Sequence, residues 1–118
     1  MITRTIMVTF SEVGFHEWPE APPETLYLAS EHRHRFDFRV EARVQGDDRE
    51  VEFHCLLQAI KLAMVHAFIR DDAGYKFGMR SCEHIAVDLK ARIAADFAIS
   101  AIEVWEDGEC GARVEWSA

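Results

Sequence analysis

The chain has 118 residues, of which 49% are hydrophobic, and a formal net charge of −8 at neutral pH. This length suits a single domain over residues 1–118, and the apolar content is ample for a core. The acidic residues are spread along the chain, which argues against a nucleic-acid backbone as partner. We expect a cytoplasmic protein without a membrane partner, because we find no signal-peptide pattern, no membrane-spanning apolar run and no disulfide framework among three widely spaced cysteines.

The N-terminal part of the chain predicts a long antiparallel hairpin. Residues 3–15 are rich in β-branched and aromatic residues, which is typical of a strand. The Pro-rich segment 17–25 predicts a connecting loop. A second strand is expected over about residues 31–45, because apolar and charged side chains alternate from Phe36 to Val44.

Two helices are expected in the middle of the chain. Apolar residues in the segment 49–70 recur at three-four spacing, and the segment 71–78 breaks this pattern. Ser81 is a plausible N-cap for a second helix that extends to about Phe97.

The C-terminal part predicts a second hairpin. Residues 100–116 alternate on both sides of an Asp107-Gly108 pair, which is a signal for a tight turn between strands. The expected order is therefore ββααββ, an α+β domain with an antiparallel four-stranded sheet and two helices on one face.

Histidines stand in the inward phase of the predicted hairpin. His32 and His34 continue the apolar phase of the second strand, and two neutral imidazoles with a third ligand and one open position describe a catalytic zinc site. Alternatively, one of them hydrogen-bonds locally and the other is solvated. His16 ends the first strand in the inward phase, and three imidazoles at one end of the hairpin favour a metal. The other histidines are expected to be ordinary surface or partly buried residues: His54, His66 and His84.

One carboxylate shares the inward phase of the last hairpin. Glu106 has the parity of Ile102 and Val104, so an inward Glu106 is suited to accept two N–H donors from a pterin or purine. Alternatively, the strand ends at Trp105 and Glu106 opens the turn.

These residues resemble the motifs of the 6-pyruvoyltetrahydropterin synthase and QueD-type 6-carboxytetrahydropterin synthase family, which has the tunnelling fold (T-fold). The family's F-x-A-A-H-x-L-P motif corresponds to FSEVGFHEWP with His16, and H-G-H corresponds to HRH at residues 32–34. D-F-x-x-L and P-T-x-E-x-x-A correspond to EFHCL (52–56) and RSCEHIA (80–86). V-x-V-x-E-T corresponds to AIEVWED with Glu106, and the order of all five motifs is kept over almost the whole chain.

The resemblance implies a Zn²⁺ ion held by His16, His32 and His34, and an intersubunit pterin pocket in which Glu106 binds the substrate. It implies a homo-oligomer, a trimer or hexamer, closed into a ring of sheets. The implied activity is a zinc-dependent lyase that acts on dihydroneopterin triphosphate or a related pterin, like the QueD-type enzymes of queuosine biosynthesis. The alternative is a non-catalytic zinc-containing protein that binds a pterin or purine as a sensor, carrier or sequestering protein.

The chain departs from the family in its acid-base residues. Leu28 stands where the synthases carry a cysteine, Ala29 stands where a subgroup carries a glutamate, and no Asp-His pair follows the first predicted helix. A lyase would then need substitutes within hydrogen-bond reach of the substrate and with a suitable pKa. The candidate catalytic residues are Glu31, His66, Asp71 and Cys82.

Overall fold

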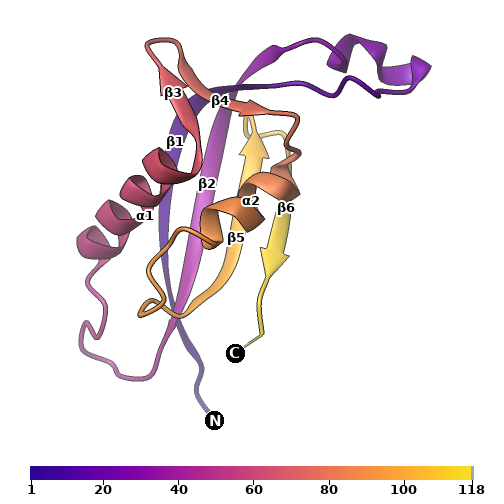
Figure 1. The fold of residues 1–118 in the computed structure, drawn as a ribbon. Coiled ribbons are helices and arrows are strands. Elements are labelled where there is room, and N and C mark those ends of the chain that lie inside the picture. Colours follow the sequence, from indigo (N-terminus) through magenta and orange to yellow (C-terminus); the bar gives the residue numbers. More distant parts are fainter. Residues whose placement is uncertain (118) are drawn as a thin grey trace.

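The computed structural model describes residues 1–117, in which six strands form one sheet and both α-helices cover the same face of it (Figure 1). The elements in chain order are β1 (Arg4–His16), the 3-10 helix η1 (Pro23–Leu28), β2 (His32–Val44), α1 (Phe53–Ala67), β3 (Ile69–Asp71), β4 (Gly74–Gly78), α2 (Cys82–Lys90), β5 (Ile99–Glu106) and β6 (Cys110–Glu115). Across the sheet the strand order is β3-β4-β1-β2-β5-β6. The α+β class is confirmed.

The two long strands pair over their whole length. The antiparallel register of β1 and β2 runs from Arg4 opposite Val44 to His16 opposite His32. On the far side, β2 pairs with β5 and β5 pairs with β6, both antiparallel. The two predicted hairpins are therefore present, and they lie next to each other in the sheet.

The predicted four-stranded antiparallel sheet is wrong, because the chain between the helices adds two strands. β3 and β4 form a small hairpin, and β4 runs parallel to the end of β1. Its turn is held by the Asp71 carboxylate, which accepts hydrogen bonds from the backbone N–H groups of Ala73 and Gly74. Tyr75 and Phe77 then point into the core with exposed fractions of 2% and 0%. The alternation covers only Tyr75, Lys76 and Phe77 between two glycines, fewer than the roughly four to eight residues from which a strand is predicted.

The second helix is shorter than expected. α2 ends at Lys90 rather than near Phe97, and Ala91 is its C-cap. Ile93 is buried and Phe97 packs against the core, although both lie in turns beyond the helix. The apolar spacing that suggested a longer helix is therefore satisfied by turns.

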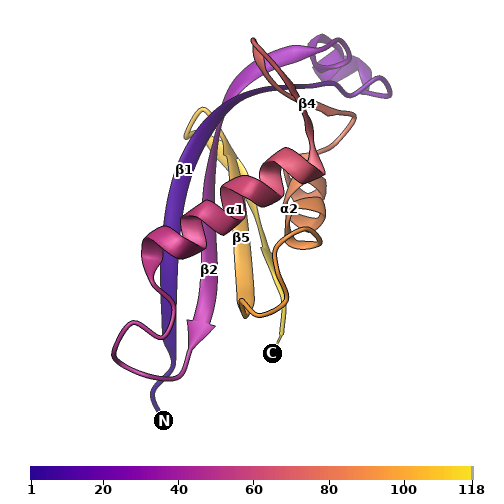
Figure 2. The same cartoon turned by 60° about the vertical axis from the view of Figure 1, so that its left-hand side comes forward.

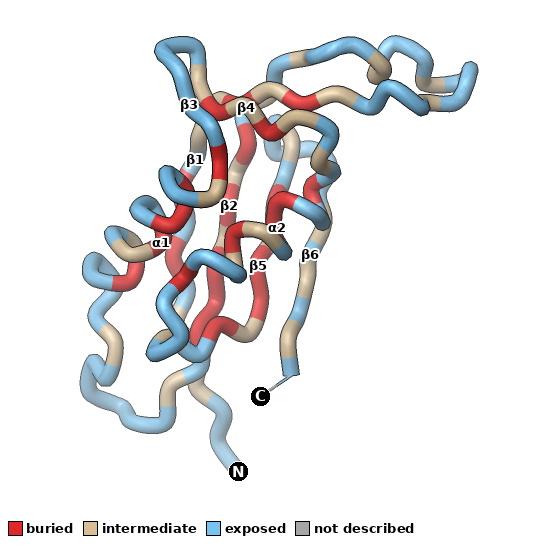
Figure 3. The backbone as a smooth tube through the Cα atoms, in the orientation of Figure 1, coloured by how far each residue is buried: buried red, intermediate tan, exposed pale blue. Residues whose placement is uncertain are grey.

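The core lies between the sheet and the helices, where Figure 3 shows buried backbone along the inner strands and the facing sides of both helices. Phe36 is fully buried within an aromatic cluster and lies 4.9 Å, between ring centroids, from Phe77. The ring of Phe36 also meets His16 and His34 edge-on, at centroid distances of 5.2 and 5.6 Å. Two of the predicted metal ligands, His16 and His34, therefore pack directly against the core.

The segment that joins β1 to β2 projects from the body of the domain, as Figures 1 and 2 both show. It includes η1, which contains no buried residue, and the side chains of Leu26 and Tyr27 are 62% and 77% exposed. Among the described residues, no helix is both long enough and apolar enough to cross a membrane.

Candidate metal centre

Three imidazoles meet where β1 ends and β2 begins. His16 is directly opposite His32 in the register, and His34 follows two residues later on the same face. One ring nitrogen from each histidine can be chosen so that all three lie within 4.8 Å of one another. The predicted convergence of these histidines therefore follows from the pairing of the two long strands.

Each imidazole is fixed from behind through its Nδ1 atom. His16 Nδ1 lies 2.9 Å from the Arg80 carbonyl oxygen, and His32 Nδ1 lies 2.8 Å from the Ser30 carbonyl oxygen. His34 Nδ1 lies 2.7 Å from the Asp107 carboxylate. Because these oxygens can only accept, each Nδ1 donates, and in a neutral imidazole the Nε2 lone pair is left free. Such outer acceptors are the usual partners of metal-binding histidines.

The donor set fits zinc. His34 Nε2 is buried and, among the described residues, makes no hydrogen bond, which is unfavourable for a polar atom that lacks another partner. Three neutral imidazole nitrogens at about 2.0–2.1 Å are a common catalytic zinc environment. His16, His32 and His34 would hold the ion after small side-chain rotations, given their present spacing.

Glu106 lies beside the imidazoles. It is the last residue of β5, so the strand includes it and the turn begins at Asp107. Its Oε2 atom is 3.1 Å from His16 Nε2, and its Oε1 atom is 3.5 Å from His34 Nε2. The hydrogen bond with His16 is the largest influence on the pKa of Glu106 and lowers it despite partial burial. Burial lowers the pKa of His16, but Glu106 and the Arg80 carbonyl together outweigh this and raise it.

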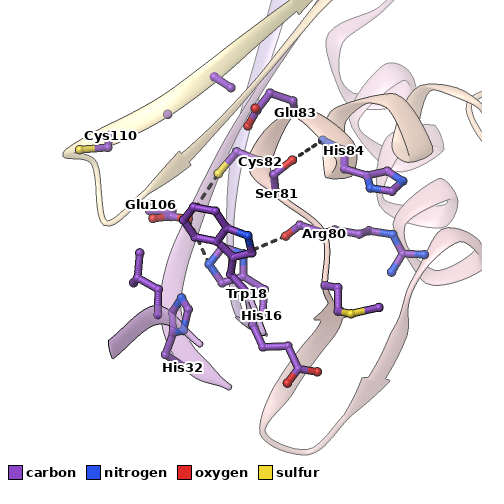
Figure 4. A pocket seen from close by; sticks show the side chains of 15 residues that line it. His16, Trp18, His32, Arg80, Ser81, Cys82, Glu83, His84, Glu106 and Cys110 are labelled. Atoms are coloured by element: carbon purple, nitrogen blue, oxygen red, sulfur yellow. Dashed lines mark hydrogen bonds and ion pairs between the residues drawn. The ribbon is translucent and has the colours of Figure 1, made fainter. Parts of the chain in front are cut away.

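A cavity of about 490 Å³ opens beside the histidines. Its lining includes Trp18 and, as Figure 4 shows, the side chains of His16 and Cys82, both of which contact Glu106. This volume is in the usual range for a small-molecule site.

Sequence reasoning missed Trp18, which belongs to the projecting segment and carried no motif signal. It also assigned Asp107 only to the turn, although Asp107 directly follows Glu106 and thereby reaches His34.

Cys82 is the one candidate catalytic residue that lies at this site in the described part of the chain. It begins α2, and its Sγ atom lies 3.6 Å from Glu106 Oε2. Burial, followed by the nearby charge of Glu106, raises the pKa of the Cys82 thiol to about 12. The thiol is therefore protonated near neutral pH. His66, by contrast, is exposed in the last turn of α1 and does not line the cavity.

Glu31 and Asp71, the remaining candidate catalytic residues, lie near Lys76 and not near the three histidines. Both approach the Lys76 ammonium group, at 3.7 and 3.9 Å respectively. That ammonium lies 3.9 Å from the centre of the Phe15 ring. Because neighbouring residues of a strand point to opposite faces, Phe15 and Lys76 lie on the face opposite His16. Within one chain, these two carboxylates are therefore separated from the histidines by the sheet.

Comparisons with known proteins identify the fold. No protein-family model and no curated protein sequence matches the chain. Among solved structures, the chain is similar to 6-pyruvoyl tetrahydropterin synthase from Caenorhabditis elegans, with a TM-score of 0.68 and 12% identity over 99% of this chain and 98% of that one. It is also similar to an uncharacterized protein from Wolinella succinogenes, with a TM-score of 0.62 and 14% identity over 99% of this chain and 100% of that one. The chain therefore shares the fold of 6-pyruvoyl tetrahydropterin synthase along its whole length.

Proposed function

We propose that the protein is a zinc-dependent lyase of the 6-carboxytetrahydropterin synthase type, acting on dihydroneopterin triphosphate or a related pterin. The observation that carries this proposal is the convergence of three imidazoles whose Nδ1 atoms are all held by oxygen acceptors. The fold shared with a pterin enzyme supports it. When bound, zinc would supply a Lewis acid that polarises a substrate oxygen.

Glu106 is the proposed binding residue for the heterocycle. Its carboxylate lines the cavity and stays ionised, since its pKa is lowered. Two carboxylate oxygens can accept the paired N–H donors of an amidine-like ring edge, a geometry that gives both affinity and orientation. Trp18 adds an aromatic side chain to the lining of the cavity.

The acid-base residues favour a second candidate function, in which the protein binds a pterin or purine without converting it. Glu31 and Asp71 are paired with Lys76 on the opposite face of the sheet, and His66 lies outside the cavity. The Cys82 thiol, with its raised pKa, is a poor base near neutral pH. Catalysis by these four residues within one chain would therefore depend on Cys82 acting as an acid.

Metal analysis and a turnover assay test both candidates. We expect about one zinc per chain, lost in His34→Ala but kept in His54→Ala, a matched change of an exposed histidine on α1 that does not line the cavity. The zinc-loaded protein is then incubated with dihydroneopterin triphosphate, and product and bound ligand are separated by chromatography. Product formation supports the lyase, and tight retention of unreacted ligand supports the binder. A protein that neither turns over nor retains the pterin would overturn both candidates, as would full zinc occupancy in a variant with His16, His32 and His34 all replaced by alanine.

A further inference from the structure

The position of Glu106 relative to two histidines has the spacing of a metal's coordination sphere. Zinc in a tetrahedral site is bonded to nitrogen and oxygen at about 2.0–2.1 Å, so neighbouring ligand atoms lie about 3.3–3.4 Å apart. The Oε2 atom of Glu106 lies 3.1 Å from His16 Nε2, and its other oxygen, Oε1, lies 3.5 Å from His34 Nε2, so each oxygen faces one imidazole. These distances bracket the tetrahedral value.

The hydrogen bond at His16 Nδ1 also favours a metal between His16 and Glu106. With its Nδ1 atom donating to the Arg80 carbonyl, His16 needs a second proton on Nε2 to donate to Glu106. A metal on His16 Nε2 takes the place of that proton. The Glu106 carboxylate then loses its donor and faces the cation that replaced it.

No competing cation is available to Glu106 among the described residues. Its remaining side-chain contact is the Cys82 thiol, a weak donor at 3.6 Å. Arg80, the arginine that lines the cavity, directs its guanidinium to Asp88 at 2.7 Å and to the Phe77 carbonyl at 3.0 Å. A partly buried carboxylate without a donor is unfavourable, so the metal is its natural partner.

We propose that Glu106 is the fourth protein ligand of the metal and closes a His₃Glu site before a heterocycle binds. The inference rests on the metal site of the proposed function. An amidine edge that pairs with both oxygens of Glu106 would withdraw the carboxylate from the metal. Glu106 then has two alternative partners, and ligand binding itself opens the fourth position.

Cobalt substitution and zinc affinity test this ligand directly. A tetrahedral Co²⁺ site absorbs strongly in the visible range, and the absorption weakens when waters complete a five- or six-coordinate shell. We expect Glu106→Gln to weaken this absorption and to lower zinc affinity by more than about tenfold. Tenfold is the lower end of the loss found when a residue behind a metal ligand is replaced, and loss of a ligand itself should exceed it. The matched control is Glu109→Gln, an exposed carboxylate in the adjacent turn, which should leave both quantities unchanged.

Three further measurements test whether Glu106 is a ligand rather than a structural residue and whether it changes partners. Glu106→Ala loaded with Co²⁺ should regain strong absorption when acetate is added, because acetate can replace the missing carboxylate. Neopterin added to the Co²⁺-loaded wild-type protein should shift its spectrum. Melting of the metal-free variants, followed by circular dichroism, should match wild type and thereby show that they fold.

The outcomes are distinct. Wild-type zinc affinity and cobalt spectrum in Glu106→Gln, together with no effect of acetate on Glu106→Ala, would overturn the fourth ligand while leaving the histidine site intact. An unchanged spectrum with bound neopterin would overturn the exchange of partners. Absence of zinc from the wild-type protein, or its retention when His16, His32 and His34 are all replaced by alanine, would overturn the metal site on which both rest.

Discussion

Asp107 is the residue that orients His34. Its Oδ2 atom accepts from His34 Nδ1 at 2.7 Å, and its Oδ1 atom accepts from the Arg35 backbone N–H at 2.9 Å. The Arg35 backbone hydrogen bond, followed by the one from His34, lowers the pKa of Asp107. A charged acceptor behind a metal-binding imidazole fixes its tautomer and raises its basicity.

Replacing Asp107 by Asn should weaken zinc binding about 10- to 100-fold, the range found for outer partners of ligands. Asn keeps the size of the side chain and tolerates the φ of 55° at this position. Its amide can no longer present two acceptors, so either His34 or the Arg35 backbone loses its partner. Competition with a chromophoric chelator measures the affinity, with Glu109→Gln as the control. Equal affinities in the two variants would mean that Asp107 does not orient His34.

At the scale of elements, β1 and β4 meet at a position that only glycine fits. Gly14 is opposite Tyr75 in the parallel register. A Cβ atom there would overlap the Phe77 ring and lie 2.9 Å from Phe36 Cδ2. Because Phe36 also meets His16 edge-on, close packing at Gly14 connects the small hairpin to the three histidines.

Gly14→Ala should therefore destabilise the fold by about 1–3 kcal/mol, the usual effect of overpacking a core. The matched control is Gly46→Ala, where the nearest atom to an added Cβ is Glu50 Oε1 at 3.6 Å. This change should alter stability by no more than about 0.5 kcal/mol. Urea denaturation of both variants measures the difference. Equal midpoints would show that β4 yields to the added methyl group.

At the scale of the whole molecule, an ion-pair network joins strands on the face that the helices leave uncovered. Arg113 of β6 contacts Glu41 of β2 at 2.6 Å and Glu103 of β5 at 2.7 Å. Glu41 is only 8% exposed. The hydrogen bond from Arg113 is the largest influence on the pKa of Glu41 and lowers it despite burial.

Arg113→Met should destabilise the protein by about 1–3 kcal/mol near neutral pH, because it removes the main donor of a buried carboxylate. Arg49→Met, which removes the fully exposed pair with Asp48, is the control and should have little effect. Because the pKa of Glu41 is lower in the folded protein than its ordinary value of 4.5, ionised Glu41 stabilises the fold above that value. This stabilisation is lost as the pH falls through the pKa of Glu41 in the folded protein. The difference between wild type and Arg113→Met should therefore narrow in urea titrations from about pH 7 to about pH 3. If the difference in stability between wild type and Arg113→Met does not change with pH, it does not arise from the ionised Glu41 carboxylate.

The edges of the sheet predict self-association. Within the described residues, β1 is paired on one side only from Arg4 to Val13, and β6 is paired only with β5. Long unpaired edges invite pairing with another chain, and closing several sheets into a ring removes them. We expect a trimer or hexamer of the 13.6 kDa chain in sedimentation velocity or light scattering. A monomer at working concentration would contradict both the ring and an intersubunit site.

The sequence by itself determined which residues share a face of the long strands. Alternation from Phe36 to Val44 is a local property, because successive side chains of a strand point to opposite sides. The same parity brought His16, His32 and His34 to one end of a hairpin and placed Glu106 in the inward phase of β5. The face on which the three histidines lie could therefore be predicted from the sequence, whereas Glu106 stood between the inward phase of a strand and the start of a turn until the strand pairing decided it.

Only the tertiary structure decided what surrounds them. Strand pairing between distant segments placed β4 beside β1, and this added a parallel strand that the short segment could not signal. It also carried Glu31 and Asp71 to Lys76 on the opposite face of the sheet, away from the histidines with which the sequence had grouped them. Proximity across a sheet depends on register and on which face a strand presents, and both are set by packing of the whole domain rather than by local residue pattern.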